Sequence, residues 1–338
     1  MKKVLRGDTE IESFITHRFK GLDKVNEAID VLHSGKCLRA VVEIGDEPQL
    51  IPREKSKLTL LSKSRLYGGY QYRYKHWSDT TNCEMNFSIY IPDKRERGQN
   101  IPAIIYLSGL TCTDENAPTK SNIQLYASQL GVSIVFPDTS PRGVPIQGDN
   151  DSWDFGVGAG FYVDATEEKW RTNYNMYSYI NKELISLISN YFDIDIARLG
   201  IMGHSMGGHG ALTSYLKNPG LYRSVSALAP VCNPTKTKWG QKAFEGYLGS
   251  VEKGKEYDAC ELIDSQKSEK KSIILIDQGS RDKFWKDELR GEVFVQKARE
   301  NGWEVNWRVH GGFDHSYNFV ASFVGDHVKH HANAFGLY

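Results

Sequence analysis

Net charge and long hydrophobic runs are both missing from this sequence. Lysine plus arginine and aspartate plus glutamate each total 42 residues, so the formal net charge at pH 7 is +0. This balance argues against nucleic acid or an acidic membrane surface as the main partner. No apolar run approaches the roughly 18 residues of a transmembrane helix. The basic start, MKKVLRGDTEIE, has no apolar stretch behind it and so does not match a secretory signal.

Cysteine is also scarce, with five residues in 338 and no C-x-x-C pair. A zinc site or a disulfide framework is therefore not expected, and we expect no metal and no cofactor. Scattered, odd-numbered cysteines favour a reducing, cytoplasmic setting. The five are Cys37, Cys83, Cys112, Cys232 and Cys260.

What the chain does contain is enough apolar sequence for a large core, since 40% of its residues are hydrophobic. Residues 1–44 predict a short helix followed by a strand, a unit too small to bury a core alone. Residues 45–59 are polar, hold two prolines and predict a linker. Residues 60–338 then predict one larger domain.

The larger domain alternates strands and helices, which predicts an α/β fold with a mostly parallel sheet flanked by helices. It opens with an antiparallel hairpin, because residues 70–78 and 83–92 both alternate in polarity. The near-continuous apolar run at 101–109 is typical of a buried parallel strand. Further strands are expected at 132–138, 198–203, 224–230, 272–279 and 304–312, and helices at 121–131, 175–192, 210–218, 287–302 and from about 315.

One serine stands among glycines where a strand passes into a helix. The stretch Gly203-His204-Ser205-Met206-Gly207 matches G-x-S-x-G, the nucleophile elbow of the α/β-hydrolase fold. Such a turn lifts the serine hydroxyl above the sheet. Its flanking positions pack so closely that a Cβ would clash, and only glycine has none.

An elbow serine needs a histidine as base and a carboxylate to orient it, in the chain order Ser, Asp or Glu, His. Both should follow strand ends, where ligands gather in such sheets. Asp282 follows the strand at 272–279 and is preferred over Asp277, which lies nearer the strand itself. His315 opens the last helix and is preferred over His310 at a strand end.

The other histidines are expected to be structural or exposed to solvent. The side chains of His204 and His209, next to the serine, should point elsewhere and be structural. Three histidines of the last helix are expected to face solvent: His327, His330 and His331.

Two backbone N–H groups should form the oxyanion hole. One belongs to Met206, the residue after the nucleophile. The other should come from the loop after an early strand, LSGLTCTDENAPT, where Gly109 frees the turn and Leu110 supplies the N–H.

Several longer blocks resemble the S-formylglutathione hydrolase, or esterase D, family: LSGLTCTDENA, DNDSWDFGVGAGFYVDAT, GIMGHSMGGHGAL, PVCNP, DQGSRDKF and GFDHSYNF. The likeness covers roughly residues 60–338. It implies an α/β-hydrolase fold and a cytoplasmic, commonly dimeric serine esterase without cofactor. Such enzymes hydrolyse S-formylglutathione to glutathione and formate and also cleave simple esters.

The resemblance also implies roles for single residues. Ser205, Asp282 and His315 match the family's nucleophile, orienting acid and base. Cys112 matches a cysteine close to the family's active site, so a redox-sensitive thiol and a quiet buried cysteine are both open. Trp153 and Phe155 are candidates for the wall of a tight acyl pocket.

The carboxylates of glutathione call for cations. The candidates are Arg142, Lys238, Lys242 and Arg281. Two other functions are open: a carbohydrate or feruloyl esterase of the same fold, and a non-enzymatic scaffold that docks onto a formaldehyde dehydrogenase.

A second resemblance concerns the first 44 residues. FITHRFKGLDKVNEAIDVLHSGKCLRAVVEI is similar to the C-terminal tail of class III alcohol dehydrogenase, the glutathione-dependent formaldehyde dehydrogenase. That enzyme family makes S-formylglutathione, so a functional link is implied. The chain has no G-x-G-x-x-G cofactor fingerprint, and no dehydrogenase activity is expected of it.

Overall fold

A computed structural model describes residues 17–20, 30–31, 34, 40–43, 58–94, 99–265 and 272–337. The chain divides into two compact units, Met1–Lys57 and Leu58–Tyr338. In the first unit, β1 (His17–Lys20) pairs in parallel with β2 (Ala40–Glu43). The strand expected at residues 37–44 is thus present, whereas most of the expected helix and the linker at 45–57 lie outside the described residues.

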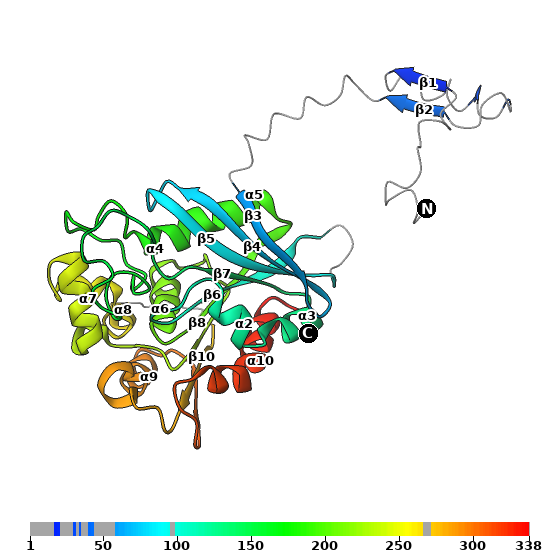
Figure 1. The fold of residues 1–338 in the computed structure, drawn as a ribbon. Helices are drawn as coiled ribbons and strands as arrows, with labels where there is room; N and C mark the ends of the chain where they lie inside the picture. Colours follow the sequence, from blue (N-terminus) through cyan, green and yellow to red (C-terminus); the bar gives the residue numbers. More distant parts are fainter. Residues whose placement is uncertain are drawn as a thin grey trace. The chain divides into compact units, whose positions relative to one another are not determined.

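The second unit is built on a nine-stranded sheet. Its strands are β3 (Leu58–Arg65), β4 (Gly69–Ser78), β5 (Cys83–Pro92), β6 (Ile101–Leu107), β7 (Ser133–Pro137), β8 (Ile194–His204), β9 (Ser224–Leu228), β10 (Ile274–Gly279) and β11 (Val305–His310). The spatial order is β11-β10-β9-β8-β6-β7-β5-β4-β3 (Figure 1). Strands β6 to β11 are parallel, and β5, β4 and β3 continue the sheet in antiparallel fashion.

This arrangement matches the predicted mostly parallel sheet with an antiparallel N-terminal hairpin. Every residue of β6, β7, β9 and β10 is buried, as expected of parallel strands covered on both faces. The edge strand β3 was not predicted. Seven of its eight residues are exposed, and its sequence lacks the polar–apolar alternation that marks a half-buried strand.

Helices cover both faces of the sheet, with α6 and α8 on one side and α3 and α10 on the other (Figure 1). The helical elements of the second unit are α2 (Asn116–Lys120), α3 (Ile123–Leu130), α4 (Met176–Ser178), η4 (Tyr179–Leu184), α5 (Ile185–Tyr191), α6 (Met206–Lys217), η5 (Pro234–Lys236), α7 (Lys238–Leu248), η6 (Lys253–Tyr257), α8 (Ala259–Ser265), η7 (Trp285–Leu289), α9 (Gly291–Glu300) and α10 (Tyr317–Ala334). Within the described residues, no helix is both long and apolar enough to cross a lipid bilayer.

Two helical segments differ from expectation. The single helix expected at 287–302 is broken at Arg290, whose φ of 54° interrupts the chain between η7 and α9. Helix α7 was missed, although Trp239, Ala243, Phe244 and Tyr247 recur at helical spacing and are all buried.

Candidate active site

Ser205 occupies a strained turn between the end of β8 and the start of α6. Its φ of 59° and ψ of −121° are rare for a residue with a side chain. A Cβ on Gly203 would lie 2.1 Å from the Gly207 carbonyl oxygen, and one on Gly207 would lie 1.9 Å from that of Leu107. The steric reason for the two glycines of the elbow is therefore confirmed.

The structure brings Ser205, His315 and Asp282 into one hydrogen-bonded chain. The Ser205 Oγ lies 2.9 Å from Nε2 of His315, and Nδ1 of the same ring lies 2.5 Å from Oδ2 of Asp282. These contacts fit a serine O–H that donates to Nε2 and an Nδ1–H that donates to the carboxylate. Asp282 and His315 follow the neighbouring strands β10 and β11, and this adjacency brings them together.

The Asp282 carboxylate is held in place by its own loop. Oδ1 accepts the Phe284 N–H at 2.9 Å and Oδ2 accepts Nε2 of Gln278 at 3.2 Å. Its side chain is fully buried, whereas the His315 side chain is 18% exposed. The acid is thus fixed, and the imidazole retains access to a substrate.

The predicted oxyanion donors flank the serine. Gly109 lies so close that a Cβ there would be 3.1 Å from Cβ and 3.7 Å from Oγ of Ser205. Leu110 follows it, and Met206 begins α6, where the helix dipole is positive. Within the described part of the chain, neither the Leu110 nor the Met206 N–H has a hydrogen-bond acceptor. Both are available for a developing negative charge.

The rival acid and base contact each other and not the serine. Asp277 accepts two hydrogen bonds of 2.6 Å from Arg308, and its Oδ2 lies 3.3 Å from Nε2 of His310. His327 approaches the same oxygen at 3.2 Å. This second cluster ties β10, β11 and α10 together beneath the loops that carry Asp282 and His315.

The expectation that the helix α10 histidines face solvent was wrong, since even the half-buried His330 has its Nε2 3.1 Å from the Val225 carbonyl oxygen. His327 and His331 are fully buried. The His331 ring lies between the hydroxyls of Ser224 and Ser226, at 2.6 and 2.9 Å. Polar side chains on the inner face of α10 are matched by polar partners on the sheet, a pairing that helix periodicity does not reveal.

The two histidines next to the serine behave differently from each other. Nε2 of His209 lies 2.9 Å from the Phe161 carbonyl oxygen, which is a structural role as expected. The His204 ring, however, does not point elsewhere, because its centroid lies 4.6 Å from that of His315. Burial lowers the pKa of His204 well below its usual range and His315 lowers it further, so His204 is neutral beside the candidate base.

Cys112 lies in the loop after β6 and is buried. Its Sγ is 3.9 Å from the Tyr317 hydroxyl, and burial raises the pKa of the thiol above its ordinary value. A protonated, buried thiol reacts slowly. The structure thus favours the quiet cysteine over the redox-sensitive one.

The predicted substrate contacts fall into different surroundings. Phe155 stacks on Tyr247 with centroids 4.5 Å apart and is part of an aromatic cluster. Arg142 makes an ion pair of 2.9 Å with Asp138 and donates to the Cys112 carbonyl oxygen. A third residue, Lys242, pairs with Asp154 and donates to the Ser152 hydroxyl at 2.6 Å. Arg142 and Lys242 are therefore engaged with partners of their own.

Trp153 instead lines a cavity of about 680 Å³, which is also lined by Phe284, a neighbour of the His315 ring. It is 55% exposed and meets the Trp239 ring edge-on at 5.6 Å. The Phe284 ring lies between this cavity and the triad, 4.7 Å from Trp239 and 5.1 Å from His315 by centroid. The cavity is lined by Trp153, Lys236, Lys238, Trp239, Gln241, Lys283, Phe284, Lys286, Asp287, Glu288 and Arg290.

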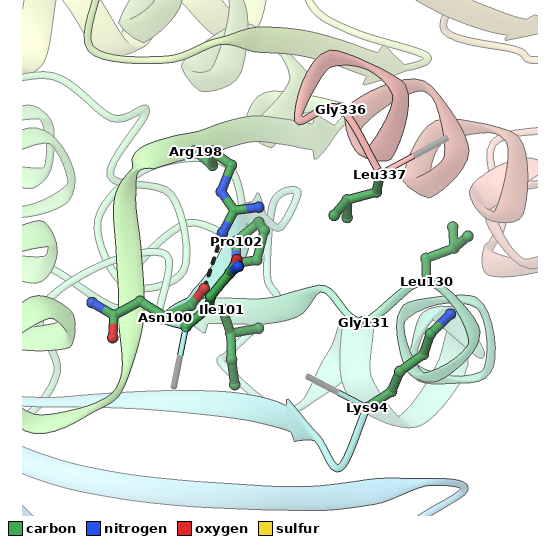
Figure 2. Close-up of a pocket in the computed structure, with 10 residues that line it drawn as sticks. Lys94, Asn100, Ile101, Pro102, Leu130, Gly131, Arg198, Gly336 and Leu337 are labelled. Carbon is green, nitrogen blue, oxygen red and sulfur yellow. Dashed lines mark hydrogen bonds between the residues drawn. The ribbon is translucent and has the colours of Figure 1, made fainter. Parts of the chain in front are cut away.

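Another cavity, of about 430 Å³, lies at the opposite ends of the strands (Figure 2). It is lined by Ile101 and Pro102 at the start of β6, by Arg198 and by Leu337 beyond α10. Because the triad follows the carboxyl ends of β8, β10 and β11, this cavity is not part of the candidate active site.

Comparison with known proteins assigns the family. The family model Esterase matches residues 78–330. The S-formylglutathione hydrolase of Bos taurus is 50% identical over 277 residues, which cover 81% of this chain and 98% of that protein. A solved S-formylglutathione hydrolase from Agrobacterium tumefaciens superposes with a TM-score of 0.79 at 41% identity, over 82% of this chain and 100% of that one.

A solved ferulic acid esterase shares the fold alone, with a TM-score of 0.63 at 17% identity over 80% of this chain and 100% of that one. The α/β-hydrolase architecture is thereby established. The identity with the bovine protein over most of both chains is far more specific, and this chain belongs to the S-formylglutathione hydrolase family of esterases.

Proposed function

We propose that this chain hydrolyses S-formylglutathione to glutathione and formate, with Ser205 as nucleophile. The hydrogen-bonded chain from Ser205 through His315 to Asp282 is the observation that carries the proposal. The names of its relatives support the substrate, whereas the feruloyl esterase alternative has only a shared fold in its favour.

In the acylation step, His315 Nε2 takes the Ser205 proton as Oγ attacks the formyl carbon. The carbonyl oxygen becomes an oxyanion that the N–H groups of Leu110 and Met206 stabilise. Collapse of this intermediate breaks the C–S bond, and the imidazolium of His315 gives its proton to the departing sulfur, which releases glutathione and leaves His315 neutral. A thiol has a pKa of about 8.5, so its thiolate leaves with little help from a general acid.

In the deacylation step, the neutral His315 removes a proton from water, which attacks the formyl ester on Ser205. Asp282 stabilises the imidazolium that forms in both steps. Formate leaves and the serine proton is restored. Every proton moves between groups of this chain, substrate and water, so the proposal needs no metal or cofactor, and simple activated esters fit the same steps.

The test is Ser205→Ala, assayed on S-formylglutathione and on p-nitrophenyl acetate. We expect kcat to fall by roughly 10⁴-fold or more on both substrates, because the nucleophile is lost. Wild-type turnover in the variant would refute the assignment of Ser205. Labelling of the wild type by a fluorophosphonate, and its loss in the variant, separates an enzyme from an inert scaffold.

We also propose a cytoplasmic homodimer with a functional link to a glutathione-dependent formaldehyde dehydrogenase. The sequence likeness of residues 10–44 to the tail of such an enzyme supports the link, because that enzyme would supply the substrate. Co-purification of the full chain with a class III alcohol dehydrogenase, compared with a chain that begins at Leu58, tests it. Equal recovery of the two chains would refute a docking role for the N-terminal unit.

A further inference from the structure

The cavity lined by Trp153, Trp239 and Phe284 carries more positive than negative charge. Five of its lining side chains are basic and two are acidic: Lys236, Lys238, Lys283, Lys286 and Arg290 against Asp287 and Glu288. The chain as a whole has a formal net charge of +0. This local excess of cations is therefore a property of the cavity and not of the overall composition.

Several of these charged groups already have partners. Lys286 lies 3.5 Å from Glu292, and Arg290 donates to the Lys236 carbonyl oxygen at 3.3 Å. The Glu288 carboxylate accepts the backbone N–H of Trp239 at 3.0 Å. Burial raises the pKa of Glu288, and the charge of Lys238 lowers it in part.

The other three lysines lack such partners. Within the described ranges of the second unit, no carboxylate lies within ion-pair distance of Lys236, Lys238 or Lys283. The Lys283 ammonium lies over the Phe284 ring, 4.8 Å from its centroid. These three lysines line one cavity from two segments, residues 236–238 at the entry to α7 and the loop after β10.

Aromatic rings connect the cavity to the candidate base, His315. Phe284 contacts the His315 ring on one side and the Trp239 ring on the other. A thioester whose carbonyl carbon reaches Ser205 can thus extend its sulfur-bearing half across Phe284 and over Trp239. A volume of about 680 Å³ is within the range of small-molecule sites.

We propose that Lys236, Lys238 and Lys283 bind the carboxylates of the glutathionyl half of the substrate over the apolar floor of Trp239. This inference rests on the proposed function and names the part of the site that selects the thiol. Glutathione carries two carboxylates and one ammonium, so it brings the net negative charge that the cavity lacks. A neutral ester reaches the same serine without these contacts.

The test compares Lys236→Gln/Lys238→Gln with the wild type, because both lysines lie far from Asp282 in sequence. Loss of two exposed ion pairs should lower kcat/KM for S-formylglutathione roughly tenfold, mainly through KM. For p-nitrophenyl acetate, which has no carboxylate, the loss should stay below about twofold. The matched control is Lys255→Gln, an exposed lysine paired with Glu252 at 2.7 Å outside the cavity.

An inhibition assay keeps this inference separate from the proposed function. S-Methylglutathione and its diethyl ester are compared as competitive inhibitors of p-nitrophenyl acetate hydrolysis. In the wild type the free acid should bind more tightly than the diester, and the double variant should lose most of that difference.

Equal binding of acid and diester by the wild type would overturn the lysine subsite, even if S-formylglutathione is turned over. An equal fall in kcat/KM for S-formylglutathione and p-nitrophenyl acetate in the double variant would likewise overturn it. Conversely, a wild-type preference for the acid without turnover of S-formylglutathione would overturn the proposed function and leave the subsite standing.

Discussion

Two aspartate–histidine pairs lie side by side at the same end of the sheet, and they differ in their third partner. Asp282 and His315 are joined at 2.5 Å, and the imidazole reaches Ser205. Asp277 and His310 approach at 3.3 Å, and the carboxylate is held by Arg308. One pair thus contacts a nucleophile and the other a permanent cation.

The surroundings of each carboxylate decide what the pair can do. Burial alone would raise the pKa of Asp277, but the hydrogen bonds from His327 and Arg308 outweigh it and hold the pKa well below its usual range. The Asp277 carboxylate is therefore neutralised and hydrogen-bonded by its own neighbours. Among the described residues, Asp282 accepts from one side-chain amide and one backbone N–H besides its histidine, and no permanent cation neutralises its charge before an imidazolium forms.

The largest effect should come from breaking the first pair with Asp282→Asn. The asparagine oxygen can still accept the Phe284 N–H, but its NH2 group cannot accept from Gln278 and no longer fixes the imidazole tautomer or stabilises its charge. We expect kcat to fall about 10⁴-fold, as in other Ser-His-Asp triads. Steady-state kinetics measure this, with thermal unfolding as the check that the fold persists. A loss of less than tenfold would mean that Asp282 is not the orienting acid.

The second pair should affect stability more than catalysis. Asp277→Asn leaves the buried end of Arg308 without its anion, which should lower the free energy of unfolding by about 3–5 kcal/mol. Denaturant unfolding measures the loss.

The control for this change is Asp326→Asn. Asp326 is the exposed partner of Arg308 at 2.7 Å, with a side chain 58% accessible. Its removal should cost at most about 1 kcal/mol. If Asp277→Asn lowers kcat as far as Asp282→Asn while stability is kept, the division of roles between the two pairs is wrong.

A histidine without a carboxylate sharpens the comparison through pH. Burial lowers the pKa of His209 from 6.5 to about 4. Between these two pH values, His209 is protonated in the unfolded chain and neutral in the folded chain. Its contribution to stability is complete above pH 6.5 and is lost as the pH falls toward 4. At about 1.4 kcal/mol per pKa unit, it amounts to roughly 3 kcal/mol.

Denaturant unfolding between pH 7.5 and 4 measures this slope in the wild type and in His209→Gln. The glutamine side chain can still donate to the Phe161 carbonyl oxygen, so the variant isolates the proton. A wild-type slope that is unchanged in His209→Gln would assign the acid sensitivity to other groups.

Much of the site could be predicted because its residues follow strand ends. The apolar run before Gly109, the elbow around Ser205 and the strands before Asp282 and His315 are each local patterns. Parallel strands then carry their carboxyl ends to one edge of the sheet. Asp282 could be preferred over Asp277 because it lies in the loop beyond the strand end, whereas Asp277 lies within the strand itself.

Other features could not be predicted from local pattern. The periodicity of helix α10 shows which positions share a face with His331. It does not show that this face packs against Ser224 and Ser226 of the sheet. The cationic cavity combines Lys238 with Lys283, which are far apart in sequence and have no shared motif. The pairing of Lys242 with Asp154 was equally invisible.

The sequence by itself determined the alternation of elements, the glycine-lined turn at Ser205 and the order of nucleophile, acid and base. These depend on local sterics and on the periodicity of apolar side chains, which act over a few residues. Only the tertiary structure decided which charged side chains form internal ion pairs and which remain free. That outcome depends on distances between segments remote in sequence, because an ion pair or a buried hydrogen bond forms only when folding brings both groups within a few ångströms.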